Sequence, residues 1–123
     1  MKYLILIYHN PESRQVWDSF SEEERAEGLG AYAALNRELA ESGELVATEA
    51  LADPEMTKVV TVRNGQVAAT DGPFAEVKEQ LAGFFLVDCE SIERAIEIGS
   101  RIPDAEVATI EVRPVMTYAG LEA

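Results

Sequence analysis

The stretch "TDGPFAEVKEQLAGFFLVDC", residues 70–89, joins a tight turn to a long apolar segment. Its run "FFLV", residues 84–87, would place apolar side chains on both faces of an extended chain. The run "KYLILIY", residues 2–8, has the same two-sided pattern. Because strands with two apolar faces are usually buried on both, these segments are predicted to form the centre of a sheet.

Two helices are predicted between the extended segments. Ser21 and Glu24 have the spacing of a capping box, in which each side chain accepts a bond from a free backbone N–H group. Gly43 supplies a C-terminal stop for this first helix. The second helix is predicted to begin after Ser91 and to end before Pro103.

Three further segments are predicted to be extended, and one to be a loop. "ELVATEAL" (residues 44–51) and "EVATIEVRPV" (106–115) read as strands, and "KVVTVRNGQVAAT" (58–70) reads as a hairpin that turns at Asn-Gly. "HNPES" (9–13) reads as a loop. The resulting order predicts an α+β fold of one domain, residues 1–123, with a ferredoxin-like βαββαβ sheet and an extra hairpin.

The two-sided strands also predict an interface. Two helices cover only one face of such a sheet, and the other face would expose an apolar patch that soluble monomers avoid. A second copy is the simplest cover, so we expect a homodimer with the two sheets facing each other.

Charge and composition limit the partners. The chain has 23 acidic and 10 basic residues, for a formal net charge of −13, which disfavours nucleic acid and anionic membranes as partners. The N-terminal apolar run is too short for a membrane span and lacks the cleavage site of a signal peptide. Cys89 is the single cysteine and can form no internal disulfide. A cytoplasmic, bacterial protein is predicted.

Three segments carry a resemblance to a known family. "DGPFAEVKEQLAGFFLVDC" (residues 71–89), "EVRPV" (111–115) and "MKYLILIY" (1–8) resemble the DGPF group of the YCII-related proteins. The resemblance implies a ferredoxin-like fold and a dimeric α+β barrel. It also implies an association with extracytoplasmic-function sigma factors, because genes of this group often lie beside theirs.

The resemblance implies an acid–base pair that the sequence does not reproduce. In the YCII branch the pair is a His on the first helix and an Asp after the second helix. Here "GLGAYAALNREL" (residues 28–39) has no His, and Tyr32 stands near its place. "RIP" (101–103) has no Asp before the Pro. The pair is therefore predicted to be absent, although a few relatives act as dehalogenating or isomerising lactone enzymes.

The turn residues Asp71, Gly72, Pro73 and Phe74 are the first candidate site. In a structural role, Asp71 caps the turn, Gly72 takes an unusual φ, Pro73 fixes the exit and Phe74 packs on apolar surface. In a functional role, Asp71 is a catalytic base at the mouth of a dimeric barrel, with the other three residues in contact with a ligand.

His9, the only histidine, is the second candidate. It is either a strand-end residue bonded to a backbone carbonyl or a proton carrier opposite Asp71. No cluster of further ligands accompanies it, so neither a metal site nor a cofactor is predicted.

Lys78 and Arg113 are candidates for binding an organic acid. Lys78, in the charged run after the turn, either lies on a solvated face or holds a carboxylate near Asp71. Arg113 either pairs with Glu111 on the same strand face or grips an anion.

Two functions therefore stay open. One is a small-molecule-binding or regulatory module that acts with a sigma factor or another regulatory protein. The other is an isomerase- or lyase-type enzyme that acts on a small organic acid in the barrel cleft with Asp71 and His9.

Overall fold

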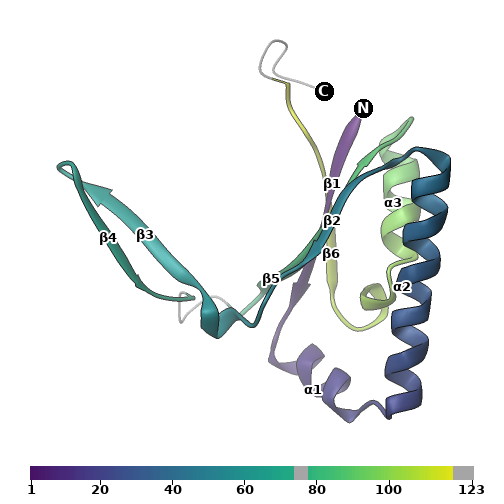
Figure 1. Cartoon of the computed structure of the whole chain (residues 1–123), viewed down its shortest axis with the longest axis horizontal. Coiled ribbons are helices and arrows are strands. Elements are labelled where there is room, and N and C mark those ends of the chain that lie inside the picture. Colours follow the sequence, from purple (N-terminus) through teal and green to yellow (C-terminus); the bar gives the residue numbers. More distant parts are fainter. Residues whose placement is uncertain (74–77, 118–123) are drawn as a thin grey trace.

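The computed structural model describes residues 1–73 and 78–117. Nine main elements follow one another along the chain (Figure 1). They are β1 (Lys2–His9), α1 (Pro11–Ser19), α2 (Glu22–Ser42), β2 (Leu45–Ala50), β3 (Lys58–Arg63), β4 (Gln66–Asp71), β5 (Gln80–Asp88), α3 (Ile92–Ser100) and β6 (Thr109–Pro114). Two 3₁₀ turns, η1 (Pro54–Met56) and η2 (Pro103–Glu106), lie in the connections.

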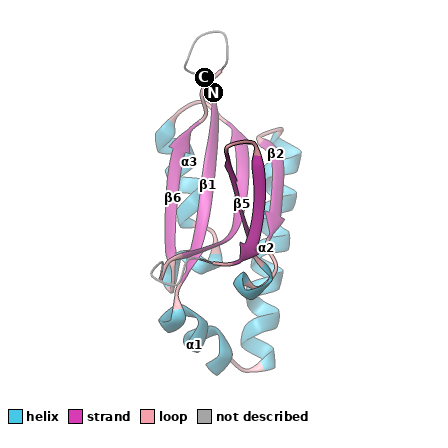
Figure 2. Ribbon diagram, turned by 90° about the vertical axis from the view of Figure 1, so that its left-hand side faces the viewer, coloured by secondary structure: helices cyan, strands magenta, loops and turns pink. Residues whose placement is uncertain are grey.

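The main sheet has the order β2-β5-β1-β6, and every neighbouring pair is antiparallel. β1 and β5 are the two central strands, as their two-sided apolar pattern predicted. Helices α2 and α3 lie on the same face of this sheet (Figures 1 and 2). β3 and β4 form a separate ribbon that turns at Asn64 and Gly65, both with positive φ. The ferredoxin-like α+β fold with an added hairpin is confirmed.

The helix ends follow the sequence signals closely. The hydroxyl of Ser21 accepts from the Glu24 N–H, and the Glu24 carboxylate accepts from the Ser21 N–H. Gly43 closes α2 in the left-handed region, with φ of 82°. Ser91 caps α3 through the Arg94 N–H.

Residues 9–13 were expected to be a loop, and this was wrong from Pro11 onward. Asn10 is an N-cap whose side chain accepts from the Ser13 N–H, and Ser13 returns the contact by accepting from the Asn10 N–H. Pro11 occupies the first turn, where no intrahelical N–H donor is required. Asn10 and Ser13 thus form a second capping box, and with Pro11 they begin α1.

The last strand begins at Thr109, three residues later than expected. Pro103 starts the turn η2, in which the backbone carbonyl of Asp104 accepts from the N–H groups of Val107 and Ala108, at 3.0 and 2.7 Å. This turn fixes the backbone of Asp104 between α3 and β6.

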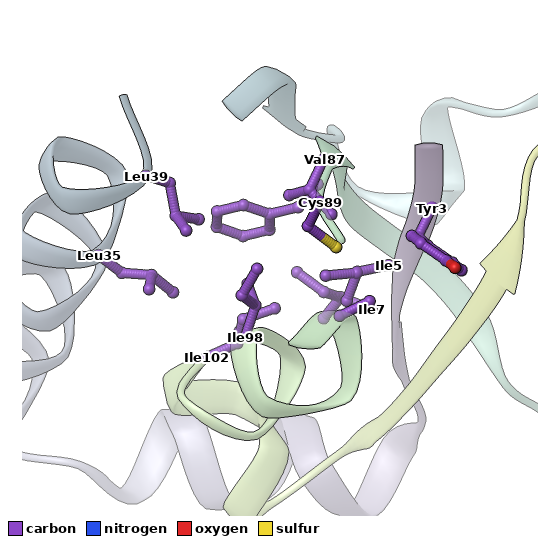
Figure 3. Close-up of a cluster of buried hydrophobic side chains, with 11 residues drawn as sticks. Tyr3, Ile5, Ile7, Leu35, Leu39, Val87, Cys89, Ile98 and Ile102 are labelled. Atoms are coloured by element: carbon purple, nitrogen blue, oxygen red, sulfur yellow. The ribbon is translucent and has the colours of Figure 1, made fainter. Parts of the chain in front are cut away.

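The core lies between the sheet and the helices (Figure 3). β1 and β5 contribute alternate side chains to it, and α2 and α3 close it from the other side. Its main members are Tyr3, Ile5, Ile7, Leu35, Leu39, Phe85, Val87, Ala95, Ile98 and Ile102, all at most 5% exposed. The opposite residues of β1 and β5, such as Leu4, Leu6, Phe84 and Leu86, are only partly buried, because no described helix lies on that face.

Alanine substitutions at two glycines test this packing, because they should change the free energy of unfolding in opposite directions. A Cβ at Gly83 would lie 2.8 Å from the Glu49 backbone oxygen, so Gly83→Ala should push β2 from β5 and lower the free energy of unfolding by ~1–3 kcal/mol. A Cβ at Gly30 meets nothing within 4 Å, so Gly30→Ala should raise it by ~0.5–1 kcal/mol. Urea unfolding measures both, and equal effects would contradict the close approach of β2.

Candidate functional site

A cavity of about 730 Å³ lies at the end of β1 where His9 emerges. Its walls come from α1, α2, the end of β2 with the following loop, and the start of β5. A ligand pocket for a small organic molecule falls in this range of size. Ile7, Tyr32 and Phe85 also line the cavity, so it lies on the side of the sheet that the helices cover.

Three polar side chains from separate elements meet in this cavity. The imidazole Nε2 of His9 lies 2.5 Å from Oδ2 of Asp104, and the Tyr32 hydroxyl donates to Oδ1 of the same carboxylate. His9 and Asp104 are about equally sheltered, with side chains 17% and 18% exposed. As expected, α2 carries no His and no Asp precedes Pro103, but a His–Asp pair forms from positions that were not predicted: β1 supplies the His and η2 supplies the Asp.

Ser13 holds the other side of the His9 ring. Its Oγ lies 3.2 Å from Nδ1 of His9 and 3.0 Å from the Asn10 carbonyl oxygen. The hydroxyl has one proton to donate, so it can serve either acceptor. With neutral His9, the hydroxyl donates to Nδ1; with protonated His9, Nδ1–H donates to Oγ, and the hydroxyl turns to Asn10. Both charge states of His9 are therefore fully hydrogen-bonded.

Tyr32 is the second donor to Asp104. Its ring stacks on that of Phe85 with centroids 6.3 Å apart and an interplanar angle of 13°. Burial, and secondly the hydrogen bond to Asp104, raise the pKa of the Tyr32 hydroxyl far above its ordinary value of 10.0. The phenol therefore keeps its proton over the whole neutral range and acts as a fixed donor.

The structure does not bring His9 and Asp71 together. Asp71 ends β4 and pairs with Lys58 on the neighbouring strand, and its side chain is 86% exposed. It is not among the residues that line the cavity, whereas His9 is. Asp71 is placed as a strand-end residue of the hairpin.

The other sequence candidates lie outside the described cavity walls. Gly72 donates its N–H to Thr57, and a Cβ there would lie 2.8 Å from the Val59 side chain. Its φ is not positive, so the expected unusual φ was wrong, and glycine is needed there for close approach. A cis peptide bond joins it to Pro73. Phe74 lies outside the described residues, and Lys78 is exposed.

Arg113 lies on the open face of the sheet, beside Glu111 and Tyr8. Burial, followed by the hydrogen bond to Glu111, raises the pKa of the Tyr8 hydroxyl. Arg113 therefore belongs to a polar group on the sheet surface that is separate from the cavity.

Nowhere in residues 1–73 and 78–117 do three or more His, Cys, Asp or Glu side chains gather as a metal site would require. None of the helices in these ranges has the length and apolar character that crossing a membrane requires.

Sequence reasoning missed Asp104, Ser13 and the role of Tyr32. An acid was expected only before Pro103. Pro103-Asp104 after a helix is a turn signal, and this signal could have identified Asp104. The N-P-x-S pattern of residues 10–13 could have revealed the cap that places Ser13.

The chain is similar to known proteins over almost its whole length. Residues 1–119 match the profile of the YCII-related domain. An uncharacterized protein of Rhizobium meliloti (strain 1021) is 32% identical over 120 residues, which cover 96% of this chain and 94% of the relative.

The Tyr32–Asp104 bond can be tested through the pH dependence of stability. Tyr32→Phe leaves one Asp104 oxygen without its donor and should lower the free energy of unfolding at neutral pH by about 1–3 kcal/mol. Above the unfolded-state pKa of 10.0, the unfolded wild type loses a phenol proton that the folded protein keeps, so wild-type stability falls with pH. The variant lacks this loss, and urea unfolding should show its deficit shrinking as the pH rises past that point. A constant deficit would contradict the assignment.

Proposed function

The chain belongs to the YCII-related family, and from this premise we propose that it is an acid–base enzyme of isomerase or lyase type that acts on a small organic acid. The observation that carries the proposal is the contact of His9 and Tyr32 with one carboxylate, Asp104, inside a cavity of ligand size. Paired titratable groups in a sheltered pocket are the arrangement that proton-transfer catalysis uses.

Asp104 is the proposed base. Each carboxylate oxygen has two lone pairs, and each accepts one hydrogen bond, from Tyr32 at Oδ1 and from His9 at Oδ2. A lone pair on the carboxylate is thus free to take a proton from a substrate carbon. The same proton is returned to another atom of the substrate in an isomerisation, or to the leaving group in an elimination.

His9 is the proposed partner that holds Asp104 in place. In either charge state of His9, its Nε2–H donates to Oδ2, while a free lone pair of the carboxylate takes the substrate proton. Ser13 supports both states by rotating one hydroxyl proton between Nδ1 and the Asn10 carbonyl. The Tyr32 hydroxyl donates a hydrogen bond to Oδ1 of Asp104 in both states and so keeps the carboxylate oriented.

Solvent exchange tests this chemistry without a known substrate. In D₂O, a panel of small carboxylic acids with a C–H next to a carbonyl group should incorporate deuterium in the presence of wild-type protein, as read by ¹H NMR. Asp104→Asn should slow this exchange by roughly 10²–10⁴-fold, the usual contribution of a general base. Asp71→Asn is the matched control on the hairpin and should leave the rate unchanged.

The outcomes separate the two functions. Equal exchange in the wild type and Asp104→Asn would overturn the acid–base proposal. Binding of a panel member without exchange would favour the alternative prediction of a small-molecule-binding or regulatory module, whose sigma-factor partner stays a prediction.

We also propose that two copies associate through the open face of the main sheet. Leu4 and Leu6 of β1 lie there beside Leu86 and Phe84 of β5, in cross-strand pairs Leu4–Leu86 and Leu6–Phe84. Four adjoining apolar side chains without a covering helix form the kind of patch that monomers avoid. A two-fold arrangement would bury this patch against itself.

A charge at the centre of the patch tests the association. Leu6→Asp should convert the dimer into monomers in sedimentation velocity, because the carboxylate would lose water on burial. Ile96→Asp is the control, since Ile96 is 53% exposed on the helix side of the sheet. A monomeric wild type at micromolar concentration would refute the interface.

A further inference from the structure

Arg14 is a charged residue of the cavity that takes no part in the contacts of His9, Asp104 and Tyr32. It follows Ser13 on α1, it is partly buried, and its side chain lines the cavity that contains His9 and Asp104. Within the described part of the chain, its guanidinium has neither a hydrogen-bond nor an ion-pair partner.

The two other partly buried arginines of the described residues, Arg25 and Arg94, show what such a group normally finds in this protein. Arg25 donates to the backbone carbonyl oxygens of Trp17 and Asp18, at 3.2 and 3.1 Å, and lies over the Trp17 ring. Arg94 donates to both carboxylate oxygens of Glu44, at 3.0 and 2.8 Å, and also to Glu97. Its side chain is 20% exposed, as expected for a charge that is compensated where it loses water. Arg14 is comparably placed but lacks such compensation.

A shortage of acidic residues does not explain this difference. The chain has 23 acidic residues against 10 basic ones, and Asp18 stands one helical turn from Arg14 on α1. No ion pair joins the two. The five N–H donors of a guanidinium match the two oxygens of a carboxylate, so an unpaired guanidinium in a cavity is a ready-made receptor for one.

The apolar side chains of the cavity wall indicate the chemical character of the rest of the ligand. Trp17, Leu29, Leu51 and Leu81 line the same cavity and are 40%, 64%, 47% and 38% exposed. Large apolar side chains that remain this exposed around a cavity indicate an apolar ligand body, which would remove their surface from water.

The charged groups around the cavity limit the charge of that ligand. Besides His9 and Asp104, the cavity is lined by Asp18, Glu49 and Asp53, three exposed carboxylates. Arg14 is the single arginine or lysine among the described lining residues. One carboxylate can be compensated there, whereas a phosphate or a dicarboxylate would meet uncompensated repulsion.

We propose that Arg14 binds the carboxylate of a singly charged organic acid with an apolar body, and so determines the substrate class of this site. The inference rests on the proposed function for its chemistry, because it places the substrate beside the His9–Asp104 pair. Arg14 is then a specificity-determining residue, and the apolar walls hold the substrate body.

Binding of matched probes tests the proposal. The probes are 3-phenylpropionate, its neutral amide 3-phenylpropanamide, and the doubly charged phenyl phosphate, each titrated into the full chain by NMR. We expect the wild type to bind the carboxylate at least about tenfold more tightly than either other probe, the scale of a lost charge-assisted contact. Arg14→Gln should weaken carboxylate binding by a similar factor and leave amide binding unchanged.

Two further variants complete the design. Arg14→Lys keeps the positive charge but lacks the paired N–H donors of a guanidinium. Its affinity for the carboxylate should therefore lie between those of Arg14→Gln and the wild type. Arg37→Gln removes an exposed arginine of α2 outside the cavity and should bind like the wild type. Failure of the wild type to bind the carboxylate, equal binding by Arg14→Gln, or equal binding of the amide would each overturn the proposal.

Asp104→Asn separates this inference from the proposed reaction. It should bind 3-phenylpropionate at least as tightly as the wild type, because it removes a negative charge from the cavity. Selective carboxylate binding that depends on Arg14, together with exchange that does not depend on Asp104, would refute the acid–base function and leave the binding site standing. Loss of carboxylate binding in Asp104→Asn would count against Arg14 as the binding residue.

Discussion

The carboxylate of Asp104 joins three parts of the chain that lie far apart in the sequence. His9 at the end of β1 and Tyr32 in α2 are 95 and 72 residues away, yet both contact this one group. A partly buried carboxylate requires such partners, because its unpaired burial would cost several kcal/mol. The cavity therefore depends on the complete sheet and helix layer, since no single hairpin or helix contains two of the three residues.

The unequal covering of the main sheet gives the molecule two different faces. The helix side contains the packed core and the cavity beside α1, a helix found at the lower end of Figure 1. The open side carries the apolar residues of β1 and β5 and the Tyr8–Glu111–Arg113 group. The proposed chemistry and the proposed association thus lie on opposite faces, so a change to one can be tested without altering the other.

Local signals in the sequence predicted most of the fold. The capping box at Ser21, the glycine stop at Gly43 and the Asn64-Gly65 turn act within a few residues, and each was found where it was expected. The YCII-related resemblance was confirmed, while membership of its DGPF group stays a prediction. The alternation in β1 and β5 also predicted which strands are central.

The site was harder to predict because contacts across the whole chain create it. His9 was singled out from the sequence and lines the cavity, but its partner depends on where η2 brings Asp104. Asp71 was chosen because it belongs to a distinctive turn, but in the structure it ends β4, pairs with Lys58 and does not line the cavity. A sequence pattern cannot state how a hairpin is oriented relative to the sheet, so it could not decide between the two acids.

The turn that carries Asp104 has a consequence for the speed of any reaction in the cavity. Its backbone carbonyl is held by two N–H groups, and its side-chain oxygens by two donors, so main chain and carboxylate are fixed from both ends. Water around a free carboxylate must reorient each time its charge changes. Here protein dipoles already occupy those positions, and the reorganisation is completed once, during folding, before any substrate enters.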